Sequence, residues 1–162
     1  MTSDKREWTH LDSQGRLKMV DVGDKDITAR EARAQAVVCL SPETLHRILD
    51  QSLPKGNVFE AARLAGILAA KRTWELIPLC HSLQLSGVDI DFSSDLEESR
   101  IKITSRARTQ DRTGVEMEAL VAVTNAALTI YDMCKAVDRA MSITDVRLIF
   151  KSGGRSGTYR RD

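Results

Sequence analysis

The chain has 162 residues, with 24 Lys and Arg against 23 Asp and Glu, which leaves a net charge of +1 at pH 7. This balance excludes a polybasic arm or an acidic tail, and a hydrophobic content of 42% excludes a disordered chain. Domains have roughly 100–200 residues, so we expect one domain over residues 1–162. Within it we expect a loosely held arm at 1–18 and a flexible, glycine-rich basic tail at 152–162.

The cellular compartment is predicted from two kinds of segment that are not seen in the sequence, a membrane span and a signal peptide. The longest run without a polar side chain, Leu64–Ala70, is far shorter than the ~20 residues that cross a bilayer. The first twelve residues contain no apolar signal core. The three cysteines, Cys39, Cys80 and Cys134, form no CxxC pair and have no zinc-ligand spacing with His or carboxylates. We therefore expect a cytoplasmic protein with reduced thiols and no metal.

The first half of the chain predicts one strand and two helices. Apolar residues alternate through Arg30–Leu40, a period of two that favours a strand. The alternating positions are Ala32, Ala34, Ala36, Val38 and Leu40. Ser41 followed by Pro42 predicts the start of a helix that runs to about Gln51. Asn57 is a plausible cap for the alanine-rich helix that follows.

The second half predicts a hairpin, a long helix and a last strand. Val88, Ile90 and Phe92 alternate, as do Ile101 and Ile103, with the turn SDLEES between the two runs. A helix is predicted over about 115–140 and a strand over 145–150. The order matches an α+β fold, the ferredoxin-like βαββαβ sandwich with an extra helix, in which helices cover one face of an antiparallel sheet.

The long predicted helix is apolar on two sides. One stripe, with steps of three and four residues, should lie on the sheet. It comprises Leu120, Val123, Ala127, Ile130, Cys134, Val137 and Met141. Val121 and Leu128 lie on the other side, near Asn125, Asp132 and Lys135. A helix with two apolar sides is usually buried on both, so we expect another subunit to cover the second side.

Several polar residues have both a structural and a functional interpretation. Asp132 and Lys135, three apart, form either an exposed ion pair or an acid–base pair. Thr113 and Glu116 match a capping box, and Glu118 complements the helix dipole. A lone histidine such as His81 is more often structural than catalytic. Lys55, which precedes a predicted helix, and the cations of the tail could bind an anion.

Taken together, longer segments carry a family resemblance. The segments are MVDV at 19–22, Lys55–Trp74, LIPLCH at 76–81, TGVEMEAL at 113–120, ALTIYDMCKAV at 127–137 and KSGG at 151–154. In order and spacing they resemble the cyclic pyranopterin monophosphate synthase (accessory protein) family, MoaC, of molybdenum cofactor biosynthesis. The tail arginine Arg155 and the polar Asn125 depart from the family pattern.

The resemblance implies a lyase that assembles as a hexamer, a trimer of dimers. Its substrate would be 3′,8-cyclised dihydro-GTP supplied by an upstream radical GTP cyclase. Its products would be cyclic pyranopterin monophosphate and pyrophosphate. Neither ring rearrangement nor phosphate cyclisation needs a redox centre, so we expect no cofactor. Nucleic acid and membranes are not expected partners.

The resemblance also implies roles for residues at matching positions. It places Asp132, Lys135 and Lys55 in catalysis, the first two as general base and general acid. It places ten residues around the substrate, with the cations suited to a triphosphate. They are Leu79, Cys80, His81, Met117, Glu118, Glu116, Asp21, Lys25, Arg30 and Lys151.

The helix geometry predicts a pocket between subunits. Glu118 and Asp132 both point away from the apolar stripe, and 14 residues separate them. At 1.5 Å per residue that is roughly 21 Å along one helix, too far for one reacting centre to lie near both. If both residues serve one pocket, they come from two chains.

Two other classes of protein share parts of this pattern. A non-enzymatic ferredoxin-like module could bind RNA on its sheet or a nucleotide as a regulator. RNA binding predicts aromatic residues on adjacent strands, yet aromatics make up only 4% of the chain. A GTP hydrolase would need a phosphate-binding loop after a strand, and the glycines of the tail do not have that order.

Overall fold

A computed structural model describes residues 10–161 of the chain. Its elements in chain order are β1 (Thr28–Cys39), α1 (Pro42–Leu49), α2 (Val58–Lys71), α3 (Thr73–Leu76), β2 (Leu85–Asp95), β3 (Arg100–Asp111), α4 (Glu116–Cys134), β4 (Ser142–Ser152) and β5 (Tyr159–Arg160). The α+β class and the expected βαββαβ order are confirmed. The short helix α3 and the strand β5 were not expected from the sequence.

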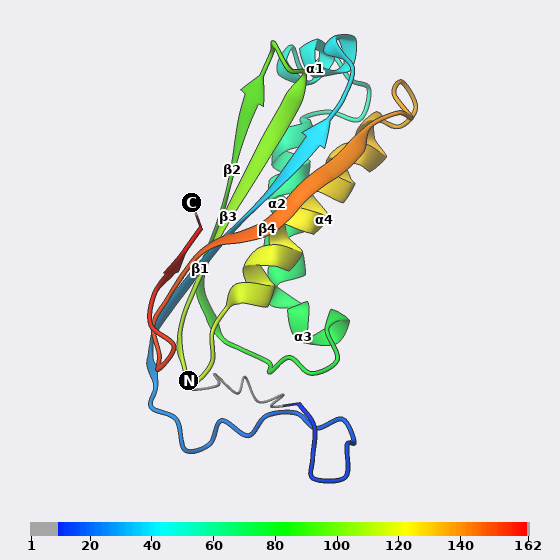
Figure 1. The fold of residues 1–162 in the computed structure, drawn as a ribbon. Coiled ribbons are helices and arrows are strands. Elements are labelled where there is room, and N and C mark those ends of the chain that lie inside the picture. The colour runs from blue at the N-terminus through cyan, green and yellow to red at the C-terminus, as the bar shows by residue number, and fades with distance from the viewer. Residues whose placement is uncertain (1–9, 162) are drawn as a thin grey trace, which may run out of the picture.

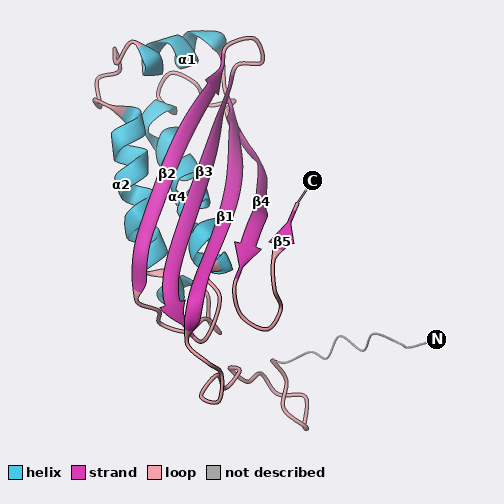
Figure 2. Ribbon diagram, turned by 90° about the vertical axis from the view of Figure 1, so that its left-hand side faces the viewer, coloured by secondary structure: helices cyan, strands magenta, loops and turns pink. Residues whose placement is uncertain are grey.

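One antiparallel sheet has the strand order β2-β3-β1-β4-β5. Helices α2 and α4 cover one face of the sheet, and no helix within residues 10–161 lies on the opposite face (Figures 1 and 2). This is the arrangement expected for a ferredoxin-like sandwich. The strand β5, which pairs through Tyr159 and Arg160 with the end of β4, lies within the segment expected to be a flexible tail.

Small side chains on β1 allow α4 to lie close to the sheet. Ala32, Ala34, Ala36 and Val38 are each fully buried, as the alternation predicted. The facing side of α4 is also built largely from buried alanines and from Val123 and Ile130. Alanine is a poor strand former, so tertiary packing against α4 outweighs local propensity here.

The starts of the two earlier helices agree with the sequence. The Ser41 hydroxyl accepts a hydrogen bond from the amide of Thr44 at 3.2 Å, with Pro42 at the first helical position. The Asn57 side chain accepts from the amide of Glu60 at 3.1 Å. Each cap satisfies an amide that has no partner within its helix, which is why α1 and α2 begin at these residues.

The long helix begins where the sequence predicts, but its cap and its C-terminal end differ from the prediction. Its N-cap is Val115, without a side-chain cap, so Glu116 is the first helical residue and the expected capping box with Thr113 is wrong. At the other end α4 stops at Cys134 instead of continuing to about residue 140. The buried carboxylate of Asp138 accepts hydrogen bonds from the amides of Ser41 and Ala140, which ties the chain to the start of α1 and turns it away from the helix.

Helices α2 and α4 pack along their length in opposite directions. A Cβ added at Gly66 would lie 2.8 Å from the Ala122 carbonyl oxygen, so the two backbones approach closely there. The Asn125 side chain donates to the Ala65 carbonyl at 3.0 Å, a bond that accounts for a polar residue in this interface. Among residues 10–161, no helix has the length and apolar composition that crossing a membrane requires.

Candidate functional site

Three charged residues, termed the Asp132 cluster, meet where α4 ends and α2 begins. They are Lys55, Asp132 and Lys135. The Lys135 Nζ lies 2.6 Å from Asp132 Oδ1, and the Lys55 Nζ lies 3.3 Å from Asp132 Oδ2 and 2.9 Å from the Asp132 carbonyl oxygen. The structure therefore brings together all three residues that the resemblance assigned to catalysis.

Helix geometry places these groups. Lys135 caps α4 one turn after Asp132, and Lys55 lies in the loop before α2, which runs antiparallel to α4. The Asp132 side chain is 59% exposed, although it lies between two ammonium groups. Hydrogen bonds and charge from Lys135 and then Lys55 hold the pKa of Asp132 below its usual value, while Asp132 raises the pKa of Lys135. The cluster is a carboxylate clamped by two cations, open to solvent.

A cavity of about 290 Å³, termed the Glu118 cavity, lies at the other end of α4. Three segments build it. They are the chain before β1, termed the approach to β1, the loop between α3 and β2, and the start of α4. Its lining residues are His10, Val20, Val22, Lys25, Leu79, Cys80, His81, Leu83, Thr113, Gly114, Glu116, Met117 and Glu118. It brings together seven of the ten residues expected around the substrate.

Glu118 is the buried acid of this cavity. Its side chain is only 4% exposed, because the approach to β1 and the loop before β2 cover the first turn of α4. The helix spacing, which sets Glu118 apart from the apolar stripe, did not predict this burial by other segments. Burial, and then the charge of Glu116, raises the pKa of Glu118 to about 7. A carboxyl group with this pKa exchanges protons near neutral pH.

His81 and Cys80 bring the loop before β2 into the cavity wall. The His81 Nε2 lies 2.9 Å from the Val20 carbonyl oxygen, so this nitrogen carries a proton and ties the loop to the approach to β1. Burial, and then the Glu118 charge, raises the pKa of the Cys80 thiol. His81 therefore tethers the loop and also lines the cavity, and its role in binding a substrate stays a prediction.

Three expected residues, Asp21, Arg30 and Lys151, are not among those that line this cavity. Lys25 lines it and also a second hollow of about 420 Å³ that contains Arg30 and Arg155. Arg30 donates to the carbonyl oxygens of Asp111 and Arg112, and the Lys151 Nζ is 3.8 Å from a Glu116 carboxylate oxygen. The Asp21 carboxylate, which accepts from the amide of Gly23, is not among the residues that line either hollow.

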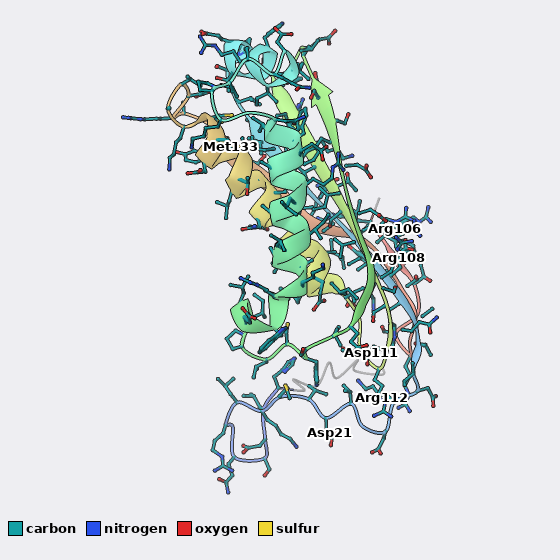
Figure 3. All side chains as sticks on the ribbon, turned by 180° about the vertical axis from the view of Figure 1, so that it is seen from behind. Asp21, Arg106, Arg108, Asp111, Arg112 and Met133 are labelled. Carbon is teal, nitrogen blue, oxygen red and sulfur yellow. The ribbon has the colours of Figure 1, made fainter. Side chains whose placement is uncertain are left out.

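One chain does not bring the two groups of residues together. Helix α4 has 19 residues, a length of roughly 28 Å at 1.5 Å per residue. Figure 3 shows Met133, the neighbour of Asp132 in the chain, at the opposite end of the molecule from Asp21. The Glu118 cavity and the Asp132 cluster are thus separate sites within one subunit.

Some cavity residues were not singled out from the sequence. Val20 and Val22 fall within the MVDV segment, but their apolar side chains carry no sign of a cavity role. Leu83 follows His81 by two residues in an extended segment, a spacing that could have placed both on one side. Within residues 10–161, no three His, Cys, Asp or Glu side chains gather in a way that could hold a metal ion. The absence of a metal stays a prediction.

Comparisons with known proteins agree with the sequence motifs. Residues 19–154 match the MoaC family. A cyclic pyranopterin monophosphate synthase of Pelotomaculum thermopropionicum is 60% identical over 153 residues, 94% of this chain and 90% of the relative. One of Chloroflexus aurantiacus is 57% identical over 161 residues, 99% of each chain. One of Desulfatibacillum aliphaticivorans is 56% identical over 94% of this chain and 96% of the relative. The expected resemblance is confirmed, and the chain belongs to the MoaC family.

Proposed function

We propose that two copies of the chain build each functional pocket, with the Glu118 cavity of one copy facing the Asp132 cluster of the other. The chain is an enzyme, a lyase of molybdenum cofactor biosynthesis that acts on a small-molecule pterin precursor to form cyclic pyranopterin monophosphate. One observation carries the two-copy pocket: the residues expected to serve one reaction lie at opposite ends of a 19-residue helix.

The apolar second side of α4 is where the neighbouring copy binds. It forms a groove with the end of α3 and the residue after it, and Leu76 and Leu128 in that groove are 60% and 52% exposed. The other groove residues are Ile77, Met117, Leu120, Val121, Thr124 and Asn125. A two-fold axis across this groove places each end of one α4 near the opposite end of the other, so the pocket forms twice per dimer. Three dimers make the hexamer, which works in the cytoplasm.

The substrate in this proposal is 3′,8-cyclised dihydro-GTP from the upstream radical GTP cyclase. The purine-derived ring opens and closes again as a pterin, and a sugar hydroxyl attacks the innermost phosphorus. The new P–O bond closes the cyclic phosphate, while the bond to the outer two phosphates breaks and pyrophosphate leaves.

Acid–base groups on both sides of the pocket serve these steps. Asp132, ionised beside two cations, accepts a proton, and Lys135 donates one. Lys55 orients Asp132 through its carboxylate and carbonyl oxygens. Glu118, with a pKa of about 7, exchanges protons during the ring rearrangement.

The cations beside the Glu118 cavity suit the triphosphate. Lys25 joins the cavity to the hollow that holds Arg30 and Arg155, and Lys151 lies at the cavity edge near Glu116. Charge-assisted hydrogen bonds from lysine and arginine are the usual contacts of protein-bound phosphates. Leu79, Cys80, His81 and Met117 line the same cavity and bind the substrate, with His81 and the backbone in contact with its phosphate or sugar.

Complementation between two inactive variants tests the shared pocket. Chains with Glu118→Ala and chains with Asp132→Ala are unfolded, mixed and refolded together, and release of pyrophosphate from the cyclised substrate is measured. A hybrid dimer contains one pocket with both residues intact, so partial activity should return. Each variant refolded alone is the control. Correctly assembled hybrids that remain as inactive as either parent would show that the pocket lies within one chain.

A further inference from the structure

Strand β3 carries two buried hydroxyl groups on the face that packs against the helices. Ser105 is fully buried and Thr109 is 2% exposed. The Ser105 hydroxyl donates to the Ala119 carbonyl at 2.7 Å, and the Thr109 hydroxyl donates to the Gln84 carbonyl at 2.6 Å. Both bonds leave the sheet and reach other segments of the chain. A buried hydroxyl without a partner is costly, so each bond constrains the segment that accepts it.

The two accepting carbonyls belong to two segments that also supply lining residues of the Glu118 cavity, since Ala119 adjoins Glu118 and Gln84 adjoins Leu83. Ala119 is the residue after Glu118 in the first turns of α4, where no side-chain cap holds the helix start. Gln84 ends the loop that carries Cys80 and His81, just before β2 begins.

The hydrogen bond from Thr109 to Gln84 lies where the hydrogen-bond ladder between β2 and β3 is interrupted. The pairing of β2 with β3 shifts register between Leu85 and Gly87, next to the partner position of Thr109. A register shift of this kind locally disrupts the ladder hydrogen bonds. The Thr109 hydroxyl supplies a bond to the chain at the point where the regular ladder ends.

We infer that Thr109 and Ser105 are positioning residues, which hold two segments that line the Glu118 cavity on one rigid strand and so set its width for the substrate. The inference rests on the proposed function for the identity of the substrate. Neither hydroxyl is among the groups that line the cavity, so both act through the segments they hold.

Removal of the Thr109 hydroxyl is the central test. Thr109→Val keeps the side-chain shape, and Thr109→Ser keeps the hydroxyl. Thr44→Val is the matched control, because Thr44 is also 2% exposed and its hydroxyl oxygen accepts from Ser41 at 2.9 Å. Thr44 lies in α1, and Figure 1 shows α1 at the opposite end of the sheet from α3, which the cavity-lining loop follows. Thermal unfolding checks that the two valine variants lose similar stability.

Two readouts separate positioning from general destabilisation. With 3′,8-cyclised dihydro-GTP, Thr109→Val should raise KM by about fivefold or more, the effect of one lost hydrogen bond, and change kcat much less. Alkylation of Cys80 by iodoacetamide, followed by mass spectrometry, should be faster in Thr109→Val, with Cys39 as the internal reference. Thr109→Ser and Thr44→Val should match the wild type in both, and Ser105→Ala should raise KM as Thr109→Val does.

The alkylation readout needs no turnover, so the two proposals can fail separately. If the wild type releases no pyrophosphate from the cyclised substrate, the proposed function is wrong and alkylation alone decides the inference. If iodoacetamide alkylates Cys80 at the same rate in Thr109→Val as in Thr44→Val, the positioning role of Thr109 is wrong. If the Thr109→Val enzyme is active and its KM equals that of the wild type, the Thr109 hydroxyl does not set the cavity width for the substrate.

Discussion

The ammonium group of Lys55 lies 2.9 Å from the carbonyl oxygen of Asp132, although 77 residues separate them in the chain. The same nitrogen lies 3.3 Å from an Asp132 carboxylate oxygen, so one lysine binds both the backbone and the side chain of one residue. Antiparallel packing of α2 against α4 creates this contact. It turns a pair three residues apart in sequence, Asp132 and Lys135, into a cluster of three charges.

Loss of the side chain of Asp132 or of Lys135 should impair catalysis without unfolding the protein. Asp132→Ala and Lys135→Ala should each reduce turnover at least ~10²-fold, the low end for general acid–base groups. Both side chains are more than half exposed, so thermal stability should stay near that of the wild type. Lys71→Ala, which removes an exposed cation elsewhere, is the control and should keep full activity. Wild-type rates in the two cluster variants would contradict their assignment.

The buried Glu118 should make stability depend on pH. Its pKa is about 7 in the folded chain against an ordinary 4.5, so the folded state holds this proton more tightly than the unfolded state does. The stability that protonated Glu118 contributes is present below pH 4.5 and is lost as pH rises through 7. Relative to Glu118→Gln, the wild type should lose on the order of 3 kcal/mol across this range.

Denaturant unfolding at several pH values and one protein concentration measures that difference. Glu98→Gln, a change at an exposed carboxylate in the turn between β2 and β3, is the control and should show no such trend. A constant difference between the wild type and Glu118→Gln from pH 4 to pH 8 would mean that Glu118 titrates as an ordinary carboxyl group.

Gly66 should not tolerate a methyl group. Gly to Ala in an exposed helix interior usually gains about 1 kcal/mol of stability. At Gly66 the added Cβ would lie 2.3 Å from Ile90 Cδ1 and 2.8 Å from the Ala122 carbonyl oxygen. Gly66→Ala should therefore lose about 1–3 kcal/mol of unfolding free energy as α2 and α4 are forced apart. Lys71→Ala, exposed on the same helix, should stay within about 0.5 kcal/mol of the wild type.

The purified protein should contain no stoichiometric zinc or iron. Cys39, Cys80 and Cys134 are separate free thiols, and no group of metal-ligating side chains gathers among residues 10–161. Elemental analysis of protein purified without chelators checks this expectation. One tightly held transition-metal ion per chain, retained through dialysis, would contradict it.

Features that depend on neighbouring residues could be predicted from the amino-acid sequence. Alternating alanines located β1, and Ser41 and Asn57 located the starts of α1 and α2, because a strand period or a cap is a local property. The long motifs identified the family, since their order and spacing are read directly from the chain. The pairing of Asp132 with Lys135 followed from helix spacing alone.

Features that depend on contacts between distant segments could not be predicted in this way. The end of α4 at Cys134 depends on the contact of Asp138 with Ser41, and the burial of Glu118 depends on a loop more than thirty residues earlier in the chain. The position of Lys55 beside Asp132 depends on how two helices cross the same sheet face. Such contacts arise from packing between segments that are far apart in the chain. The pattern of residues within one segment does not predict which other segment will pack against it.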